Sequence, residues 1–320
     1  MVEKEIEDMV SIRRYTAADK KEWDGFVALS KNATFLHYRD YMDYHSDRFS
    51  DFSLMAFDGG RLLALLPANI AGETLYSHQG LTFGGWLMPL KHFNANTMLD
   101  VFDAMVAFLR DNGIKRLVYK AIPHIYHKYP AEEDLYALFR HNARILVTNM
   151  SSTVMSGKDI PFDRRTKRNV AKALQNGVII EPSEDYPAFW RIITANLDNR
   201  YGAKPVHSLP EIELLHSCFP ENIRLYSASL DGRMVAGAVM YEDGDWVHAQ
   251  YSSADETGFA IGAMNYLFYH LITEEYKGKS CFDFGTSNEN DGLYLNANLI
   301  ETKTGLGARG VAYNIYEMII

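Results

Sequence analysis

The strongest constraint on the fold is a weak internal repeat, because the same order of predicted elements occurs twice along the chain. Each copy consists of a hairpin, a third strand, a glycine-containing loop, a helix and a closing strand. In the first half these elements are predicted over residues 52–57, 61–70, near 75, 80–85, 96–112 and 116–122. In the second half the hairpin strands are predicted over residues 223–230 and 233–241, and the third strand over 246–252. The glycine loop is predicted over 255–262, the helix from there to about 276, and the closing strand over 280–284. Two units in the same order indicate a duplicated α/β domain.

The remaining predicted elements lie before the first copy and between the two copies. Strands are predicted over residues 12–15 and 145–154, and helices over 20–30, 132–141, 162–176 and 187–200. A chain of 320 residues is long enough for two domains, at about 100–200 residues each. We place the boundary near Ser156-Gly157, which gives an N-terminal domain over residues 1–156 and a C-terminal domain over 157–320.

Charge and composition exclude several classes of protein. A net charge of −9 does not favour sequence-independent binding to duplex DNA. No run reaches the roughly 18–20 apolar residues of a membrane span, and the acidic first eight residues do not resemble a secretory signal. The two cysteines, Cys218 and Cys281, are expected to be buried thiols in a reducing compartment, so we expect a cytoplasmic protein. Neither cysteine has the spacing of a metal site, and we expect no metal.

A basic helix over residues 162–176 reverses the sign of the surface charge locally. Five cations occur within nine residues: Arg164, Arg165, Lys167, Arg168 and Lys172. The pattern fits either a solvated helix face or the recognition of phosphates, including a tRNA backbone. Arg200 and Tyr201 end the following helix, where the arginine either complements the helix dipole or binds an anion.

The glycine loop of the second copy, residues 255–262, ends a strand and begins a helix. Unpaired backbone N–H groups at such a helix start can bind a pyrophosphate. Gly258 and Gly262 fit that interpretation, but they also fit a turn with close helix–strand packing.

The C-terminal stretch places a carboxylate and a cation among glycines. Asp283 is the polar residue of an otherwise apolar strand, and Gly285 follows it. A carboxylate at the end of a strand either faces a ligand crevice or forms a local turn. Lys303 stands between two predicted turns further on.

These segments resemble the FemAB-like branch of the GNAT acyltransferase superfamily. The resemblance rests on Tyr251-Ser252, on Phe282-Asp283-Phe284-Gly285, and on Lys303 ahead of Gly305 and Gly307. It implies an α/β fold (α+β by some schemes) of tandem GNAT-like domains, each with a mixed, mainly antiparallel sheet flanked by helices. Two features depart from the family: no helical insertion for tRNA is present, and the acetyl-CoA signature is degenerate over residues 257–262.

The resemblance implies transfer of an acyl group to an amine. We expect a thioester donor such as acyl-CoA as a co-substrate, no tightly bound cofactor, and a small-molecule amine acceptor, with a cell-envelope precursor as one candidate. A FemAB-type enzyme that uses aminoacyl-tRNA is a less favoured alternative, and a non-catalytic GNAT-like binding protein is another.

The chemistry of the reaction assigns roles to the residues of the second half. Transfer to an amine needs a proton acceptor, a group that stabilises the oxyanion, and a proton donor for the leaving group. We expect Asp283, Lys303 and Tyr251 in these roles, with Glu256 as a second candidate base and His248 as either a base or, more in keeping with its strand position, a structural residue. The residues expected to bind the donor are Ser252, Gly258, Ile261 and Gly262. Those expected to bind the substrate are Arg165, Arg168, Arg200, Tyr201 and Gly285. The first half is expected to shape the acceptor cleft.

Overall fold

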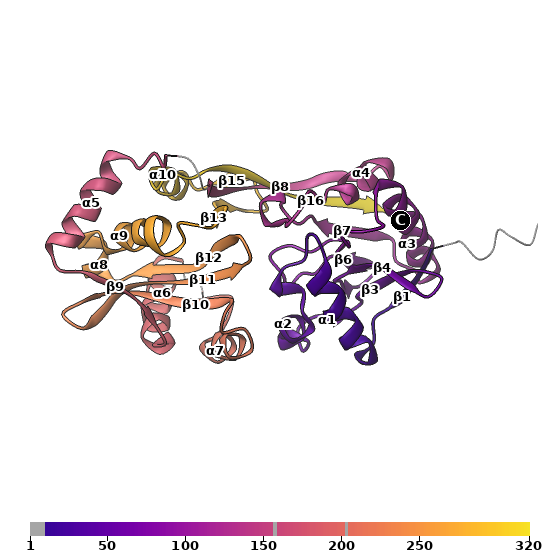
Figure 1. Ribbon diagram of the computed structural model, residues 1–320, viewed down its shortest axis with the longest axis horizontal. Helices are drawn as coiled ribbons and strands as arrows, with labels where there is room; N and C mark the ends of the chain where they lie inside the picture. Colours follow the sequence, from indigo (N-terminus) through magenta and orange to yellow (C-terminus); the bar gives the residue numbers. More distant parts are fainter. Residues whose placement is uncertain (1–9, 156–158, 202–203) are drawn as a thin grey trace, which may run out of the picture. The chain divides into compact units, whose positions relative to one another are not determined.

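The chain folds into two compact units in a computed structural model that describes residues 10–155, 159–201 and 204–320 (Figure 1). The first unit consists of residues up to Thr148 together with Ala312–Ile320, and the second of Asn149–Val311. Two long strands, β8 (Arg144–Met155) and β16 (Arg309–Ile319), contain residues of both units. The domain boundary expected near residues 156 and 157 lies outside the described residues. The two units instead meet along the sequence after residue 148 and again after residue 311.

The strands of the first unit form two sheets. β1 (Ser11–Arg14), β3 (Leu54–Asp58) and β4 (Arg61–Leu66) make an antiparallel sheet in the order β1-β3-β4. The other sheet has the order β2-β5-β6-β7-β16 and includes β2 (Ser50–Asp51), β5 (Asn69–Ala71), β6 (Thr74–Tyr76) and β7 (Arg116–Lys120). Within it, β6 and β7 are parallel, and helix α3 (Ala95–Asp111) connects them.

Helix α3 supplies the largest part of the first unit's core. The Asn94 side chain accepts from the backbone N–H groups of Asn96 and Thr97, which begins the helix. Met98, Phe102 and Met105 on one face are fully buried against the sheets. The other helices of this unit are α1 (Lys20–Leu29), α2 (Arg39–Met42) and α4 (Glu133–Arg140), with 3₁₀ turns η1 (Ala17–Asp19), η2 (Phe35–His37), η3 (Asp43–His45) and η4 (His124–Tyr126).

The second unit is built on one sheet in the order β8-β13-β12-β11-β10-β9. Its strands besides β8 are β9 (Ile179–Ser183), β10 (Ile223–Leu230), β11 (Arg233–Asp243), β12 (Trp246–Ala254) and β13 (Cys281–Thr286). Neighbouring strands are antiparallel except for the parallel pair β12 and β13. Asp231 and Gly232 both have positive φ (51° and 75°), as the tight hairpin between β10 and β11 requires. A small hairpin of β14 (Asn288–Glu289) and β15 (Tyr294–Leu295) follows β13.

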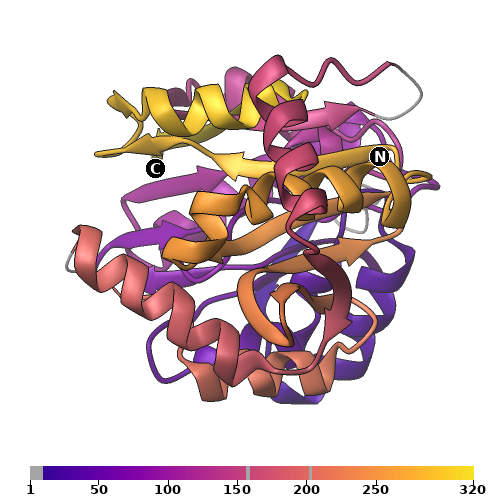
Figure 2. The ribbon, with the colours of Figure 1, turned by 90° about the vertical axis from the view of Figure 1, so that its left-hand side faces the viewer.

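Helices cover both faces of this sheet (Figures 1 and 2). One face carries α5 (Arg164–Gln175), α8 (Glu256–Ile261), α9 (Ala263–His270), the π-helical turn η5 (Leu271–Glu275) and α10 (Ala297–Gly305). The other carries α6 (Tyr186–Tyr201) and α7 (Leu209–Cys218). The core forms where Leu267, Phe268 and Leu271 pack on Ala238 and Met240 of β11.

The repeat expected from the sequence is present as two parallel strand pairs, each joined by a helix. The hairpins differ, because β10 and β11 continue the sheet of β12, whereas β3 and β4 join β1 in a separate sheet. The strand predicted over residues 61–70 divides at Pro67, which has no N–H to donate to a sheet. The loop predicted over residues 255–262 instead contains helix α8, which ends at Gly262 with a φ of +81°, and the predicted helix begins after it as α9.

Two other features differ from the expectations. Cys218 is exposed, because it is the last residue of α7, whereas Cys281 is buried as expected; both are free thiols. The strand β9 and the helix α7 were not predicted, although Ser208 and Glu211 form a capping box that marks the start of α7. Across the described ranges, every helix is too short or too polar to cross a bilayer.

Candidate functional site

The parallel strands β12 and β13 separate soon after they pair. Their register covers only Trp246–His248 against Cys281–Asp283, although β12 continues to Ala254. A bulge in β12 bends it further, since Tyr251 faces Val239 while Ala249 faces Met240. Two parallel strands that part in this way leave an opening at their C-terminal ends, where α/β proteins commonly bind ligands.

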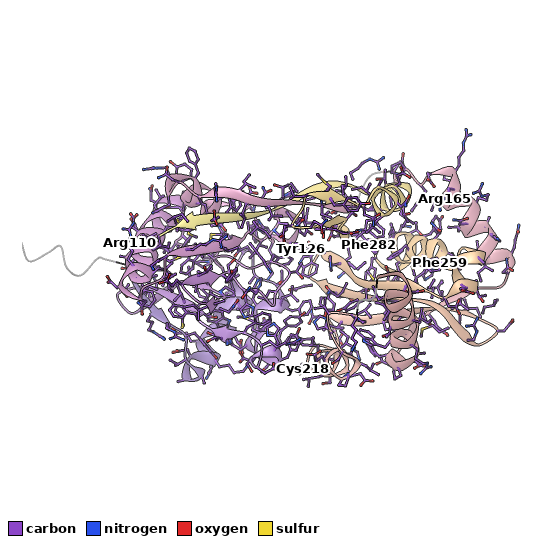
Figure 3. The ribbon with its side chains drawn as sticks, turned by 180° about the vertical axis from the view of Figure 1, so that it is seen from behind. Arg110, Tyr126, Arg165, Cys218, Phe259 and Phe282 are labelled. Atoms are coloured by element: carbon purple, nitrogen blue, oxygen red, sulfur yellow. The ribbon has the colours of Figure 1, made fainter. Side chains whose placement is uncertain are left out.

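A cleft of about 510 Å³ occupies this region of the second unit. Much of its wall is apolar, and asparagine side chains provide most of the polar groups. Figure 3 shows two lining residues, Arg165 on α5 and Phe259 on α8, at the same end of the unit. The lining comprises Arg165, Asn169, Ile193, Asn196, Leu197, Ala249, Ser252, Ser253, Phe259, Met264, Asn265, Phe268, Phe284, Asn296, Asn298, Leu299, Thr302, Lys303 and Leu306.

Lys303 is a buried cation in the wall of this cleft. Its side chain is 7 % exposed, and its Nζ donates to the carbonyl oxygens of Gly285 at 2.8 Å and Thr286 at 2.9 Å. Burial lowers the pKa of Lys303 to about 8, although the nearby charge of Asp283 acts in the opposite direction. An ammonium has three N–H donors, so two of them fix the position of the charge and the third remains for a group in the cleft.

Asp283, on the strand that precedes Gly285, is fully buried. Its Oδ1 accepts from the hydroxyls of Ser151 at 2.6 Å and Thr153 at 2.8 Å. Its Oδ2 accepts from His248 Nδ1 at 2.8 Å and from the backbone N–H of Gly285 at 3.0 Å. Burial raises the pKa of Asp283, but the donors from His248, Ser151 and Thr153 outweigh it and hold the pKa at about 2. A carboxylate with these four donors is a weak proton acceptor, and Asp283 is not among the described residues that line the cleft.

His248 is a polar residue that the sequence pattern marked only weakly. It pairs in register with Asp283, and its side chain is 13 % exposed. The alternation of Trp246, His248 and Gln250 along one strand was visible, but the carboxylate partner was not, because 35 residues separate His248 from Asp283.

Gly285 connects the two charged groups. Its φ is +72°, and a Cβ at this position would lie 3.1 Å from Cε1 of His248. Its N–H binds Asp283 and its carbonyl oxygen binds Lys303. The backbone of Gly285 thus fixes the positions of Asp283 and Lys303. Gly285 is outside the described cleft lining, so its contact with substrate stays a prediction.

The hydroxyl of Tyr251, the predicted proton donor, is hydrogen-bonded to His207. Its hydroxyl lies 2.6 Å from Nδ1 of His207 and accepts from the His207 backbone N–H at 3.1 Å. Its ring packs edge-on against Trp190 of α6. Burial raises the pKa of Tyr251 to about 12. The structure places its hydroxyl against His207, and Ser252 is the residue of this pair that lines the cleft.

The glycines of the predicted donor loop are required by close packing. A Cβ on Gly258 would lie 2.2 Å from the carbonyl oxygen of Val235, and one on Gly262 would lie 2.6 Å from that of Asn169. Gly258, Ile261 and Gly262 all lie outside the described lining, which takes Phe259 from this helix. Their contact with a donor stays a prediction.

The basic helix contributes one residue to the cleft. Arg165 lines it, whereas Arg168 is exposed elsewhere on α5. Lys172 donates to the carbonyl oxygen of Ala260 at 2.7 Å. Arg200 and Tyr201 end α6, but their side chains lie outside the described residues. Glu256 is exposed in the first turn of α8. In the described chain, no three His, Cys, Asp or Glu side chains come together as a metal site would require.

The comparisons with known proteins agree with this geometry. Residues 162–291 match the model of the acetyltransferase (GNAT) domain. The second unit is therefore built around a GNAT domain. More particularly, the fold of the whole chain is shared with solved structures that include FemX and a tandem GNAT protein.

Three solved structures share this fold over nearly the whole chain. FemX is 12 % identical, with a TM-score of 0.69 and 97 % of each chain covered. The C-terminal domain of a putative lysylphosphatidylglycerol synthetase from Agrobacterium fabrum is 12 % identical, with a TM-score of 0.59 and 95 % and 91 % covered. A tandem GNAT protein from the clavulanic acid biosynthesis pathway is 10 % identical, with a TM-score of 0.50 and 97 % and 98 % covered. No curated protein sequence matches the chain significantly.

Proposed function

We propose that this protein is an N-acyltransferase that transfers an acyl group from a thioester, such as acyl-CoA, to an amine in the cleft of the second unit. The observation that carries the proposal is Lys303, a cation buried in the cleft wall and fixed by two backbone carbonyl oxygens. A desolvated charge is costly to keep unless it binds a group of opposite charge. Lys303 is therefore suited to an anion that arrives or develops in the cleft.

The charge of Lys303 matches the chemistry of acyl transfer. When an amine adds to a thioester, negative charge develops on the carbonyl oxygen, and a preorganised donor stabilises it. The two carbonyl oxygens hold the Lys303 ammonium in place before the reaction, so little reorganisation is required. With a pKa of about 8, Lys303 is mostly charged at neutral pH.

The cleft lining fits the arm of a thioester donor. A pantetheine arm alternates methylene groups with amides, and the walls combine apolar side chains with asparagines. Arg165 at the cleft and the exposed cations of α5 suit the phosphates at the far end of such a donor.

An aminoacyl-tRNA donor is the second candidate. Arg164, Lys167 and Arg168 are exposed on α5 outside the described cleft lining, as a longer phosphate backbone would require. The fold shared with FemX and with a putative lysylphosphatidylglycerol synthetase supports this candidate.

Binding measurements separate the candidates. We expect CoA and acetyl-CoA to raise the melting temperature of the full chain, and we expect Arg165→Ala to reduce that shift. Binding of tRNA that weakens steeply with salt and is lost in Arg164→Ala/Arg168→Ala, without any shift by CoA, would instead select the second candidate. Binding of CoA without acyl transfer to any amine would identify a non-catalytic protein.

A further inference from the structure

Two asparagines from different helices are hydrogen-bonded to each other in the wall of the cleft. Asn169 is on α5 and Asn265 is near the start of α9, and both line the cleft of the second unit. Nδ2 of Asn169 donates to Oδ1 of Asn265 at 2.9 Å. A side-chain amide has two N–H donors and a carbonyl oxygen with two lone pairs, so the pair retains hydrogen-bonding capacity for a ligand.

Close backbone packing holds this asparagine pair in place. Gly262 directly precedes α9, and a Cβ there would lie 2.6 Å from the carbonyl oxygen of Asn169 and 2.9 Å from its Cβ. Gly262 thus lets α9 approach α5 closely enough for the pair to form. About one turn further along α5, Lys172 donates to the carbonyl oxygen of Ala260 at 2.7 Å. The two amides are therefore fixed by contacts between their helices before any ligand binds.

The hydrogen bond within the pair leaves one acceptor atom, Oδ1 of Asn169, and one donor atom, Nδ2 of Asn265, unused. In the parts of the chain that the structure describes, no hydrogen bond joins either atom to another residue. A ligand amide is planar and trans, so its N–H and its carbonyl oxygen point in opposite directions. One such amide does not meet a neighbouring acceptor and donor together, whereas two successive amides of a flexible arm can meet one each.

The pair belongs to the end of the cleft that adjoins a second cavity. Arg165, Asn265 and Thr302 line both the cleft and this cavity of about 500 Å³, so the two spaces meet at these residues. Asn169 is four residues from Arg165, which places both side chains on the same face of α5. Lys303 lines the cleft and is outside the described lining of the second cavity. The asparagines therefore lie beside the cation suited to phosphates, in the same cleft as the cation suited to the reacting group.

We propose that Asn169 and Asn265 form a subsite that recognises the two successive amides of a pantetheine arm on the acyl donor. This inference rests on the proposed function in its thioester form and names the class of donor. Asn169 Oδ1 accepts from the N–H of one amide, and Asn265 Nδ2 donates to the carbonyl oxygen of the other. An aminoacyl-tRNA has no successive amides beside its ester, so the subsite selects a thioester carried on a two-amide arm.

The experiment measures acetyl transfer by the full chain to a lysine-containing pentapeptide from S-acetyl-pantetheine, which has two amides, and from S-acetyl-N-acetylcysteamine, which has one. We expect Asn169→Ala and Asn265→Ala each to raise KM for S-acetyl-pantetheine by about 3–10-fold with little change in kcat, because each removes one neutral hydrogen bond to the arm. One variant should also weaken the one-amide donor and the other should not, since the two contacts go to different amides. The matched control is Gln175→Ala, an exposed amide on α5 outside the described lining.

The outcomes separate the two proposals. If the wild type transfers the acetyl group and both variants keep its KM for S-acetyl-pantetheine, the subsite is wrong while the proposed function stands. A rise in KM for the pentapeptide alone would assign the pair to the acceptor and also overturn the inference. If the wild type transfers nothing, the proposed function fails, and the side-chain amide resonances of Asn169 and Asn265 decide the inference without turnover. Shifts of both on adding CoA, with Gln175 unchanged, support it, and unshifted asparagine resonances overturn it.

Discussion

Lys303 and Asp283 are both hydrogen-bonded to the backbone of one residue, Gly285. The carbonyl oxygen of Gly285 accepts from Lys303 Nζ at 2.8 Å, and its N–H donates to Asp283 Oδ2 at 3.0 Å. Both charged side chains are buried, yet both are satisfied by groups within the second unit. The backbone of Gly285 therefore keeps both charged groups in fixed positions.

The Gly285→Ala substitution should destabilise the protein and impair the site together. A residue with a Cβ is strained at a φ of +72°, and the Cβ would press on His248 at 3.1 Å. We expect a loss of about 1–2 kcal/mol in the free energy of unfolding, measured by urea denaturation. The control is Gly278→Ala, where a Cβ would meet nothing within 4 Å and φ is not in the left-handed region. Equal losses in the two variants would contradict the structural role of Gly285.

Two helical glycines should respond to alanine with opposite signs. Gly25 is exposed in α1 and a Cβ there would meet nothing within 4 Å, so Gly25→Ala should stabilise by about 0.5–1 kcal/mol. A Cβ on Gly258 in α8 would lie 2.2 Å from the carbonyl oxygen of Val235, so Gly258→Ala should destabilise despite its better helix propensity. Thermal unfolding of both variants measures the signs. A stabilised Gly258→Ala would show that this helix does not pack against β11 as described.

Lys303 should give the activity an alkaline limit. Burial lowers the pKa of Lys303 to about 8, so the charge that stabilises the oxyanion disappears above that pH. We expect kcat to fall as pH rises through about 8, and we expect Lys303→Met to lose roughly 10²–10³-fold at neutral pH. The pH profile of Lys303→Arg, which stays charged, is the informative comparison, because any remaining activity should lack the limb near 8.

Lys303 should also affect stability in alkali. Its folded pKa lies below its ordinary value of 10.5, so the unfolded chain binds more protons between about 8 and 10.5. The contribution of this lysine to the free energy of unfolding therefore rises with pH across that window. Urea denaturation of the wild type and Lys303→Met should differ in slope there. Parallel curves would indicate that Lys303 is solvated.

The first unit should lose stability in mild acid. Burial lowers the pKa of His37 and of His78 to about 3, against 6.5 for an ordinary histidine. Their contribution is complete above about 6.5 and is lost progressively as pH falls toward 3, because the unfolded chain takes up protons that the folded chain does not. Each histidine contributes a slope of about 1.4 kcal/mol per pH unit in that window. Hydrogen exchange of peptides from residues 35–80, at neutral pH and near pH 5, measures the effect. Unchanged protection would contradict the burial of these imidazoles.

Much of the fold could be predicted from local patterns in the sequence. Apolar spacing at Met98, Met105 and Leu267, with glycine or asparagine at the turns, identified the crossover helices of both halves. One error arose where a single residue overrides a longer pattern, as Pro67 does in a strand. Another arose over residues 255–262, where the glycines suggested a loop and the structure has helix α8. Pattern also does not report side-chain environment at helix ends, which is why the exposure of Cys218 was not predicted.

The site was predictable in part. Lys303 and Arg165 were singled out from the sequence, and both line the cleft. The pairing of His248 with Asp283 and the engagement of Tyr251 by His207 could not be found, because the fold brings together residues that are 35 and 44 positions apart. A carboxylate at a strand end looks like a base until its donors from β8 are known.

The most direct test of the role of Lys303 is a single-turnover measurement of acetyl transfer from acetyl-CoA to an amine by the wild type and by Lys303→Met, with CoA binding measured on the same samples. We predict that both bind CoA, that the wild type transfers the acetyl group, and that the variant is slower by roughly 10²–10³-fold. Transfer by Lys303→Met at the wild-type rate would contradict the central claim that the buried lysine stabilises the reacting group.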